Sequence, residues 1–192
     1  MIAAGPLWIV ASVVVVASAW KLANPAPTAR AIGALVGASP TNRSVASAQW
    51  ASRVLGLGEG AIALVVVWRG GAVVFALAAL YGAFALIALR LRRRNVACGC
   101  FGSASTKASW IHVAVNVSAT LVAAWAAAVD VPGLRDAMGE LPAHGVAHLV
   151  LVGAGTSAMI ALLTVLPAVR ELSRSRPSVD QPVLFRLRSE LG

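Results

Sequence analysis

The chain contains two cysteines, and a single residue separates them in the segment Cys98-Gly99-Cys100. Such a triplet can close a small, strained disulfide ring, and strain raises the reduction potential, so that the oxidised pair is the better oxidant. Gly99 permits the backbone angles that bring the two sulfur atoms together. Phe101 and Gly102 complete the motif CGCFG. We therefore interpret Cys98 and Cys100 as candidate redox residues.

The residues around this motif are basic, which bears on the reactivity of the cysteines. Arg92, Arg93 and Arg94 precede the motif, and Lys107 follows it. Positive charge stabilises the thiolate, the form that attacks disulfides. Two thiolates also suit Cu(I) or Zn(II), but Zn(II) would need two further ligands that the motif lacks. From these residues alone, redox chemistry, metal capture and an inert role all stay open.

The composition is that of a membrane protein. Hydrophobic residues make up 59% of the chain, charged residues make up 12%, and the mean hydropathy is +0.81; charged residues form about 25% of an ordinary soluble domain. Four runs without charged residues approach or exceed the roughly 20 residues that cross a bilayer, and they cover residues 2–20, 70–89, 108–129 and 145–169. A fifth run, 54–68, contains Glu59 and spans only if its helix begins a turn earlier, near Trp50, or if the bilayer thins locally.

We therefore predict an all-α integral membrane protein, a helical bundle of about five transmembrane helices in three parts. Residues 1–130 form a four-helix core with the CGCFG loop, residues 131–170 an acidic loop with a fifth span, and residues 171–192 a basic mobile tail. The apolar stretch 31–36 predicts an interfacial helix lying on the membrane. The glycine-containing turn at residues 69–71 predicts a hairpin between the second and third spans.

The net charge of +9 is unevenly distributed along the chain. Basic residues follow the first, third and fifth spans, whereas the loop after the fourth span is acidic. The positive-inside rule then predicts a plasma-membrane protein with an external N-terminus, a cytoplasmic CGCFG loop and a cytoplasmic tail. Topology and anionic lipid headgroups account for the positive charge, so we expect no nucleic-acid partner.

Polar residues near the span ends should gather beneath the cysteine loop. Glu59 is the most informative of them, because an ionised carboxylate in an apolar helix costs about 2 to 3 kcal/mol. Lys21 lies at the matching depth in the first span and is the expected partner. Gly58 and Gly60 would let the neighbouring helix approach closely. The pair could serve to fix the bundle or to transfer a proton.

His112 and Asn116 share one helix face, because they are four residues apart. Side chains in this arrangement either bridge helices through hydrogen bonds or take part in chemistry. His144 and His148 have the same spacing but lie on the opposite membrane face without a third ligand. We predict no metal site there.

A family resemblance rests on these residues taken in order. Lys21-Leu22 closes the first span, Glu59 opens the second, a basic stretch follows the third, and CGCFG precedes Asn116 in the fourth. Over residues 7–130 this order resembles the methylamine-utilisation MauE family, part of the wider DoxX-like group of small redox-associated membrane proteins. The chain departs from the family pattern in the lead-in Arg94-Asn95-Val96-Ala97 and at Val115, where an arginine often stands.

The resemblance implies a role in forming or maintaining disulfides in a partner protein of methylamine or amine utilisation. Our leading hypothesis is that Cys98 and Cys100 cycle between dithiol and disulfide, exchanging with a thioredoxin-like protein or a client. Arg94, His112 and the other polar residues above would support this exchange. A single pair of cysteines also requires an electron acceptor, for which a quinone is one candidate. The protein would then be a thiol-disulfide oxidoreductase or a maturation factor.

Two alternatives belong to other functional classes. In the first, the cysteines capture Cu(I), or the protein handles a small solute, and Lys21, Glu59 and His112 line the access path. In the second, the protein is a non-catalytic scaffold that anchors a membrane redox complex. The implied clients fold outside the cytoplasm, whereas the charge distribution places the cysteines inside.

Overall fold

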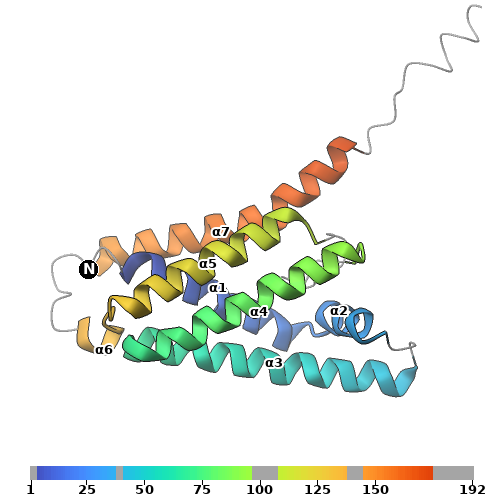
Figure 1. The fold of residues 1–192 in the computed structure, drawn as a ribbon, viewed down its shortest axis with the longest axis horizontal. Coiled ribbons are helices and arrows are strands. Elements are labelled where there is room, and N and C mark those ends of the chain that lie inside the picture. Colours follow the sequence, from blue (N-terminus) through green and yellow to red (C-terminus); the bar gives the residue numbers. More distant parts are fainter. Residues whose placement is uncertain (1–3, 38–40, 97–107, 138–144, 175–192) are drawn as a thin grey trace, which may run out of the picture.

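The computed structural model describes residues 4–37, 41–96, 108–137 and 145–174. Within these residues the chain is all-helical, as predicted (Figure 1). The long helices are α1 (Ala4–Ala23), α3 (Asn42–Arg69), α4 (Val74–Arg93), α5 (Trp110–Ala128) and α7 (Gly145–Arg174), and the shorter ones are α2 (Ala26–Val36), the 3₁₀ turn Gly71–Val73 and α6 (Leu134–Ala137).

Four of these helical stretches are long and apolar enough to cross a membrane: Ala4–Ala23, Arg43–Arg69, Gly71–Arg93 and Trp110–Ala128. The fifth predicted span falls in α7, whose described apolar part, Val150–Leu166, is shorter than the other four. Half of the apolar window of α1 is buried inside the protein, against 28% in each of the other three spans. The first span is therefore the central helix of the bundle.

The second span begins much earlier than the hydropathy pattern indicated. Thr41 caps α3, because its hydroxyl accepts a hydrogen bond from the Ser44 N–H at 3.2 Å while the Thr41 N–H donates to Ser44 Oγ at 2.9 Å. This reciprocal cap satisfies backbone donors that a helix start leaves free. The helix thus includes Trp50, as this span requires, and it begins further upstream than predicted, at Asn42.

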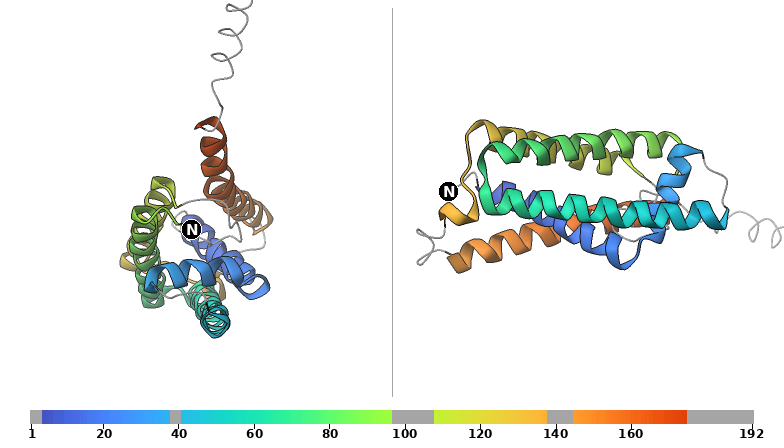
Figure 2. Two further views of the ribbon diagram at one scale, coloured as in Figure 1. Left: turned by 90° about the vertical axis from the view of Figure 1, so that its right-hand side faces the viewer. Right: turned by 90° about the horizontal axis from the view of Figure 1, so that it is seen from below.

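A helix is present where the interfacial helix was predicted, and it is longer than the predicted stretch 31–36; its position on the membrane stays a prediction. α2 begins after Pro25 and ends at Gly37, whose φ of +68° suits a glycine. It runs across the end of the bundle, beside the end of α4 and the start of α3 (Figure 2). We call this end the α2 end. The last turn of α1 and the first turn of α5 lie there too (Figure 1).

The opposite end of the bundle is closed by glycines. α3 and α4 form the predicted hairpin through Gly70 and Gly71, both with positive φ. Gly71 N–H donates to Val131 O at 2.9 Å, and Gly70 pairs with Pro132 in an isolated bridge. A Cβ atom on Gly70 would overlap the backbone of Val131. This contact ties the hairpin to the segment that follows α5.

Candidate functional site

The site begins with the close contact between α1 and α3. A Cβ atom added to Gly56 would lie 3.1 Å from Lys21 Cβ, and one added to Gly60 would lie 3.3 Å from Ser18 Cβ. Two small residues four apart let the helices approach closely. The prediction was right for Gly60 and wrong for Gly58, which is exposed and has no atom within 4 Å of such a Cβ. Gly58 lies on the outer face of α3.

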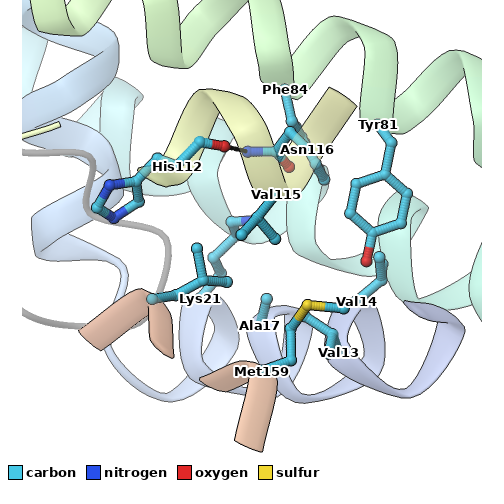
Figure 3. Close-up of a pocket in the computed structure, with 11 residues that line it drawn as sticks. Val13, Val14, Ala17, Lys21, Tyr81, Phe84, His112, Val115, Asn116 and Met159 are labelled. Carbon is cyan, nitrogen blue, oxygen red and sulfur yellow. Dashed lines mark hydrogen bonds between the residues drawn. The ribbon is translucent and has the colours of Figure 1, made fainter. Parts of the chain in front are cut away.

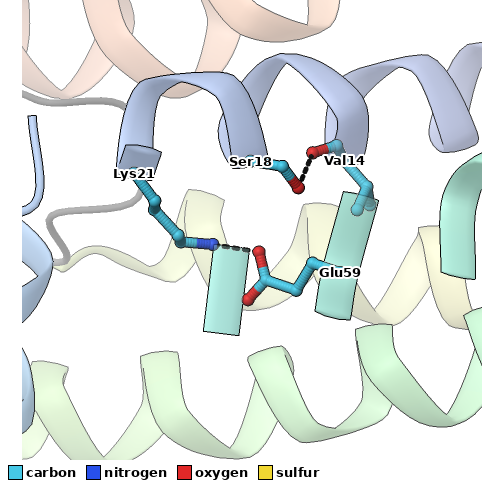
Figure 4. Close-up of polar contacts among 4 residues, drawn as sticks. All are labelled: Val14, Ser18, Lys21 and Glu59. Atoms are coloured by element: carbon cyan, nitrogen blue, oxygen red, sulfur yellow. Dashed lines mark hydrogen bonds and ion pairs between the residues drawn. The ribbon is translucent and has the colours of Figure 1, made fainter. Parts of the chain in front are cut away.

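This approach brings together the ion pair that the sequence predicted. The Lys21 ammonium donates a hydrogen bond to Glu59 Oε2 (Figure 4). Lys21 and Glu59 are only 3% and 2% exposed, and the ammonium also lies 5.2 Å from the centroid of the Phe84 ring. Glu59 Oε1 has no hydrogen-bond partner among the described residues. The pair is a buried, neutral unit near the α2 end.

His112 is held in one orientation by the start of α5. The Ser109 N–H donates to His112 Nδ1 at 3.2 Å, and the Ser109 hydroxyl lies 3.0 Å from the same nitrogen. Because Nδ1 accepts from a backbone N–H, the proton of the neutral ring is on Nε2. His112 is 5% exposed. Its second nitrogen, Nε2, is therefore a hydrogen-bond donor.

Asn116 does not bridge two helices, which was one of the two roles that its spacing from His112 left open. Its Nδ2 donates to the carbonyl of His112 at 2.6 Å, within its own helix. The two residues do share a face of α5, as their spacing indicated. The face is turned toward a cavity, and no neighbouring helix supplies the acceptor for this hydrogen bond.

A cavity of about 40 Å³ lies among α1, α4, α5 and α7 (Figure 3). Lys21, His112 and Asn116 all line it, so three of the four predicted polar residues meet there, and Glu59 joins them through Lys21. The remaining lining side chains are aromatic or aliphatic, or carry the thioether of methionine: Val13, Val14, Ala17, Tyr81, Phe84, Val115, Met159 and Leu163.

Sequence reasoning missed the contributions of α4 and α7 to this cavity. Tyr81 is the chain's single tyrosine; it is buried, and its hydroxyl donates to Val10 O at 2.7 Å. A lone phenol within an apolar span was a usable signal, since a buried hydroxyl needs an acceptor. Met159 and Leu163 come from α7, which lies outside the predicted four-helix core. Nothing in their local sequence marks them.

These residues lie within the part of the chain that a known family covers. The model of the family described as methylamine utilisation protein MauE matches residues 1–129. The chain belongs to the MauE family. No curated protein and no solved structure matches it. The MauE match runs from the N-terminus through α5 and confirms the resemblance drawn from residues 7–130; it also relates this membrane protein to methylamine utilisation.

The MauE motif itself, Cys98-Gly99-Cys100-Phe101-Gly102, lies outside the described residues, as does Lys107. The flanks of the loop are described. Ala108 N–H donates to Val96 O at 3.1 Å, and Val96 N–H donates to Leu91 O at 3.0 Å. The loop 97–107 therefore leaves and rejoins the bundle at one place, at the α2 end.

Two of the arginines before the motif have partners in the bundle. Arg94 Nη1 donates to the carbonyls of Ala34 and Leu35, at 2.5 and 3.1 Å, in the last turn of α2. A cation at the C-terminus of a helix is favourable, because free carbonyls point there. The Arg92 guanidinium lies 4.0 Å from the centroid of the Trp110 ring. Arg94 thus joins α4 to α2, and Arg92 joins α4 to α5.

The predicted absence of a metal site concerns residues that are only partly described. His144 lies outside the described residues, and His148 is in α7 but its side chain is not described. Among the described residues, no group of three or more His, Cys, Asp or Glu could hold a metal ion. Val115, one of the two departures from the MauE pattern, lines the cavity, so this wall is apolar where an arginine would add charge.

Proposed function

We propose that this MauE-family protein supports the maturation of a partner protein by disulfide exchange through Cys98 and Cys100. One observation carries the proposal. Val96 and Ala108, which bound the cysteine loop, are hydrogen-bonded to each other at the end of the bundle that holds the buried Lys21–Glu59 pair and His112. A cysteine loop whose flanks are fixed at the same end of the bundle as polar residues that are costly to bury fits a site for chemistry better than a plain helix connection.

The exchange conserves atoms and electrons in two steps. A thiolate of the client attacks one sulfur of the Cys98–Cys100 disulfide, which forms a mixed disulfide and releases the other cysteine as a thiolate. A second client thiolate then attacks the mixed disulfide, so that the client gains the disulfide and the protein gains two thiols. The client loses two electrons and two protons in total. A thioredoxin-like disulfide returns Cys98 and Cys100 to the oxidised state by the same steps in reverse.

Trapping of the mixed disulfide tests the proposal. In Cys98→Ser and Cys100→Ser single variants the remaining cysteine cannot be displaced by its neighbour. We expect one of them to accumulate an adduct with a thioredoxin-like protein or an oxidised client, because its single thiolate can attack the partner's disulfide but no second cysteine is present to release the partner. The adduct should be visible on non-reducing gels and lost on reduction. The Cys98→Ser/Cys100→Ser double variant is the matched control and should form no adduct.

The same variants separate this proposal from its alternatives. A scaffold would keep its full effect on client oxidation in the double variant and would give no adduct in either single variant. A copper carrier would be purified with stoichiometric copper that the double variant loses. Either result would overturn the exchange mechanism.

A further inference from the structure

The cavity among α1, α4, α5 and α7 has one polar wall and one apolar wall. Lys21 and His112 are buried and supply hydrogen-bond donors, whereas Phe84, Val115 and Met159 supply apolar surface. A purely apolar cavity can stay empty or bind an apolar molecule. This cavity also contains buried polar donors, and these require an acceptor. The chemistry of the walls therefore calls for a ligand with both kinds of surface.

The donors on the polar side chains that line the cavity can be counted. An ammonium group has three donor hydrogens, and one of those on Lys21 is used by Glu59 Oε2. His112 carries a hydrogen on Nε2, because Nδ1 accepts from the Ser109 N–H, and the described residues contribute no partner for Nε2. Asn116 uses one N–H of its amide on His112 O, which leaves one N–H as a donor and Oδ1 as an acceptor. Donors outnumber acceptors at the polar wall, so the matching group on a ligand is an acceptor.

Charge balance then decides between anionic and neutral acceptors. Lys21 is already neutralised by Glu59 in a buried ion pair, and the other lining residues are uncharged. An anion in the cavity would add an uncompensated charge in a region of low dielectric, which is costly. A cation would face the Lys21 ammonium. An uncharged acceptor avoids both the cost of burying a charge and the repulsion from the ammonium.

The size and opening of the cavity limit the ligand further. One water molecule needs roughly 10 to 15 Å³, so a cavity of about 40 Å³ admits a carbonyl group with its neighbouring carbon atoms. Phe84, Val115, Asn116 and Met159 are partly exposed, and they lie on α4, α5 and α7. The remainder of the ligand can therefore project between these helices toward the surrounding lipid.

We propose that this cavity binds a small, uncharged, lipid-soluble carbonyl compound, with the carbonyl oxygen directed at the polar wall of Lys21, His112 and Asn116 and the hydrocarbon part against α4, α5 and α7. The binding does not depend on the thiol exchange proposed above. The carbonyl could belong to a membrane quinone or to a non-quinone ketone, and these two sources share the same recognition chemistry.

The test uses the full chain in lipid nanodiscs with cyclohexanone labelled with ¹³C at the carbonyl. Binding with hydrogen-bond donation moves the carbonyl resonance to higher frequency, a signature that a purely structural cavity would not produce. Cyclohexane, which lacks the acceptor, and cyclohexanecarboxylate, which is charged, should each bind at least ten-fold more weakly. Duroquinone that competes with cyclohexanone identifies a quinone as the source, and duroquinone that does not compete restricts the ligand to non-quinone carbonyl compounds.

Two valines on α5 provide a matched pair of variants. Val115→Phe fills the cavity and should weaken cyclohexanone binding at least ten-fold, whereas Val117→Phe, at an exposed position of the same helix, should leave it unchanged. Ala17→Leu fills the cavity from α1 and serves if Val115→Phe does not fold. Equal binding by Val115→Phe and Val117→Phe, or equal binding of cyclohexane and cyclohexanone, would overturn the proposal.

The measurement is repeated in the Cys98→Ser/Cys100→Ser double variant. Unchanged cyclohexanone binding there is the expected result, because described residues supply both the polar and the apolar wall of the cavity. Loss of client oxidation with retained binding supports both proposals, whereas retained oxidation with retained binding overturns only the exchange mechanism. Loss of binding in the double variant would contradict a cavity that acts independently of the thiols.

Discussion

At the scale of single residues, Lys21 and Glu59 depend on each other. Both side chains are almost fully buried and form one ion pair. Burying two charges is expensive, and their attraction offsets this cost only while both are present. Removing one partner leaves an uncompensated charge, whereas removing both leaves none. The loss of either residue alone should therefore be costly, although the intact pair adds little net stability to the protein.

We predict that Lys21→Met or Glu59→Leu alone lowers the free energy of unfolding by about 3 to 5 kcal/mol, because each leaves a buried charge unpaired. The Lys21→Met/Glu59→Leu double variant should recover most of this loss. Unfolding by denaturant in detergent micelles measures all three. Additive losses in the double variant would show that the two residues are not coupled.

At the scale of elements, the contact between α1 and α3 positions the ion pair. Gly56 faces Lys21 and the Ser18 carbonyl, and Gly60 faces the Ser18 side chain. The backbones can approach because neither glycine has a side chain. Gly58 lies between them in the sequence but on the outer face of α3. The same residue type therefore has two different roles within five positions.

We predict that Gly56→Ala destabilises the protein by about 1 to 3 kcal/mol through overpacking, because its Cβ would lie 3.1 Å from Lys21 Cβ and 3.3 Å from Ser18 O. Gly58→Ala is the matched control and should be neutral or slightly stabilising, since nothing lies within 4 Å of its Cβ. Thermal unfolding of the two variants in the same detergent compares them. A larger loss for Gly58→Ala would contradict this assignment of the faces.

At the scale of the whole molecule, the two ends of the bundle carry different charges. Exposed arginines, among them Arg30, Arg43, Arg90 and Arg93, belong to the α2 end, whereas Asp130 and Asp136 are exposed near α6 at the other end. In a bacterial-type plasma membrane, basic residues are concentrated on the cytoplasmic side. The α2 end, and with it the base of the cysteine loop, is therefore expected to face the cytoplasm.

We predict that a membrane-impermeant maleimide does not label Cys98 and Cys100 in intact cells pretreated with a permeant reductant, and labels both after permeabilisation. The positive control is Asp136→Cys in the Cys98→Ser/Cys100→Ser background, which should react in intact cells because α6 is at the opposite end. Labelling of the native cysteines in intact cells, with Asp136→Cys protected, would reverse the orientation.

The sequence by itself determined the helical class, four of the candidate membrane spans apart from the start of the second, the hairpin at Gly70 and Gly71, and the placement of the polar residues near the span ends. These features are local, because hydropathy over about 20 residues fixes where a span lies and the span ends fix the depth of each side chain. The Lys21–Glu59 pair was predictable for the same reason: two opposite charges at one depth in apolar helices must meet.

Only the tertiary structure decided how each helix is rotated and which neighbours it touches. Gly56, not Gly58, faces α1; Asn116 bonds within its own helix; and Arg94 reaches the end of α2. The cavity depends on Met159 and Leu163 of α7, far along the chain from Lys21. The rotation of each helix and its choice of neighbours result from packing among segments that are distant in the sequence. In a membrane span, the residues that face lipid and the residues that face protein are both apolar, so the sequence pattern does not show which face is buried.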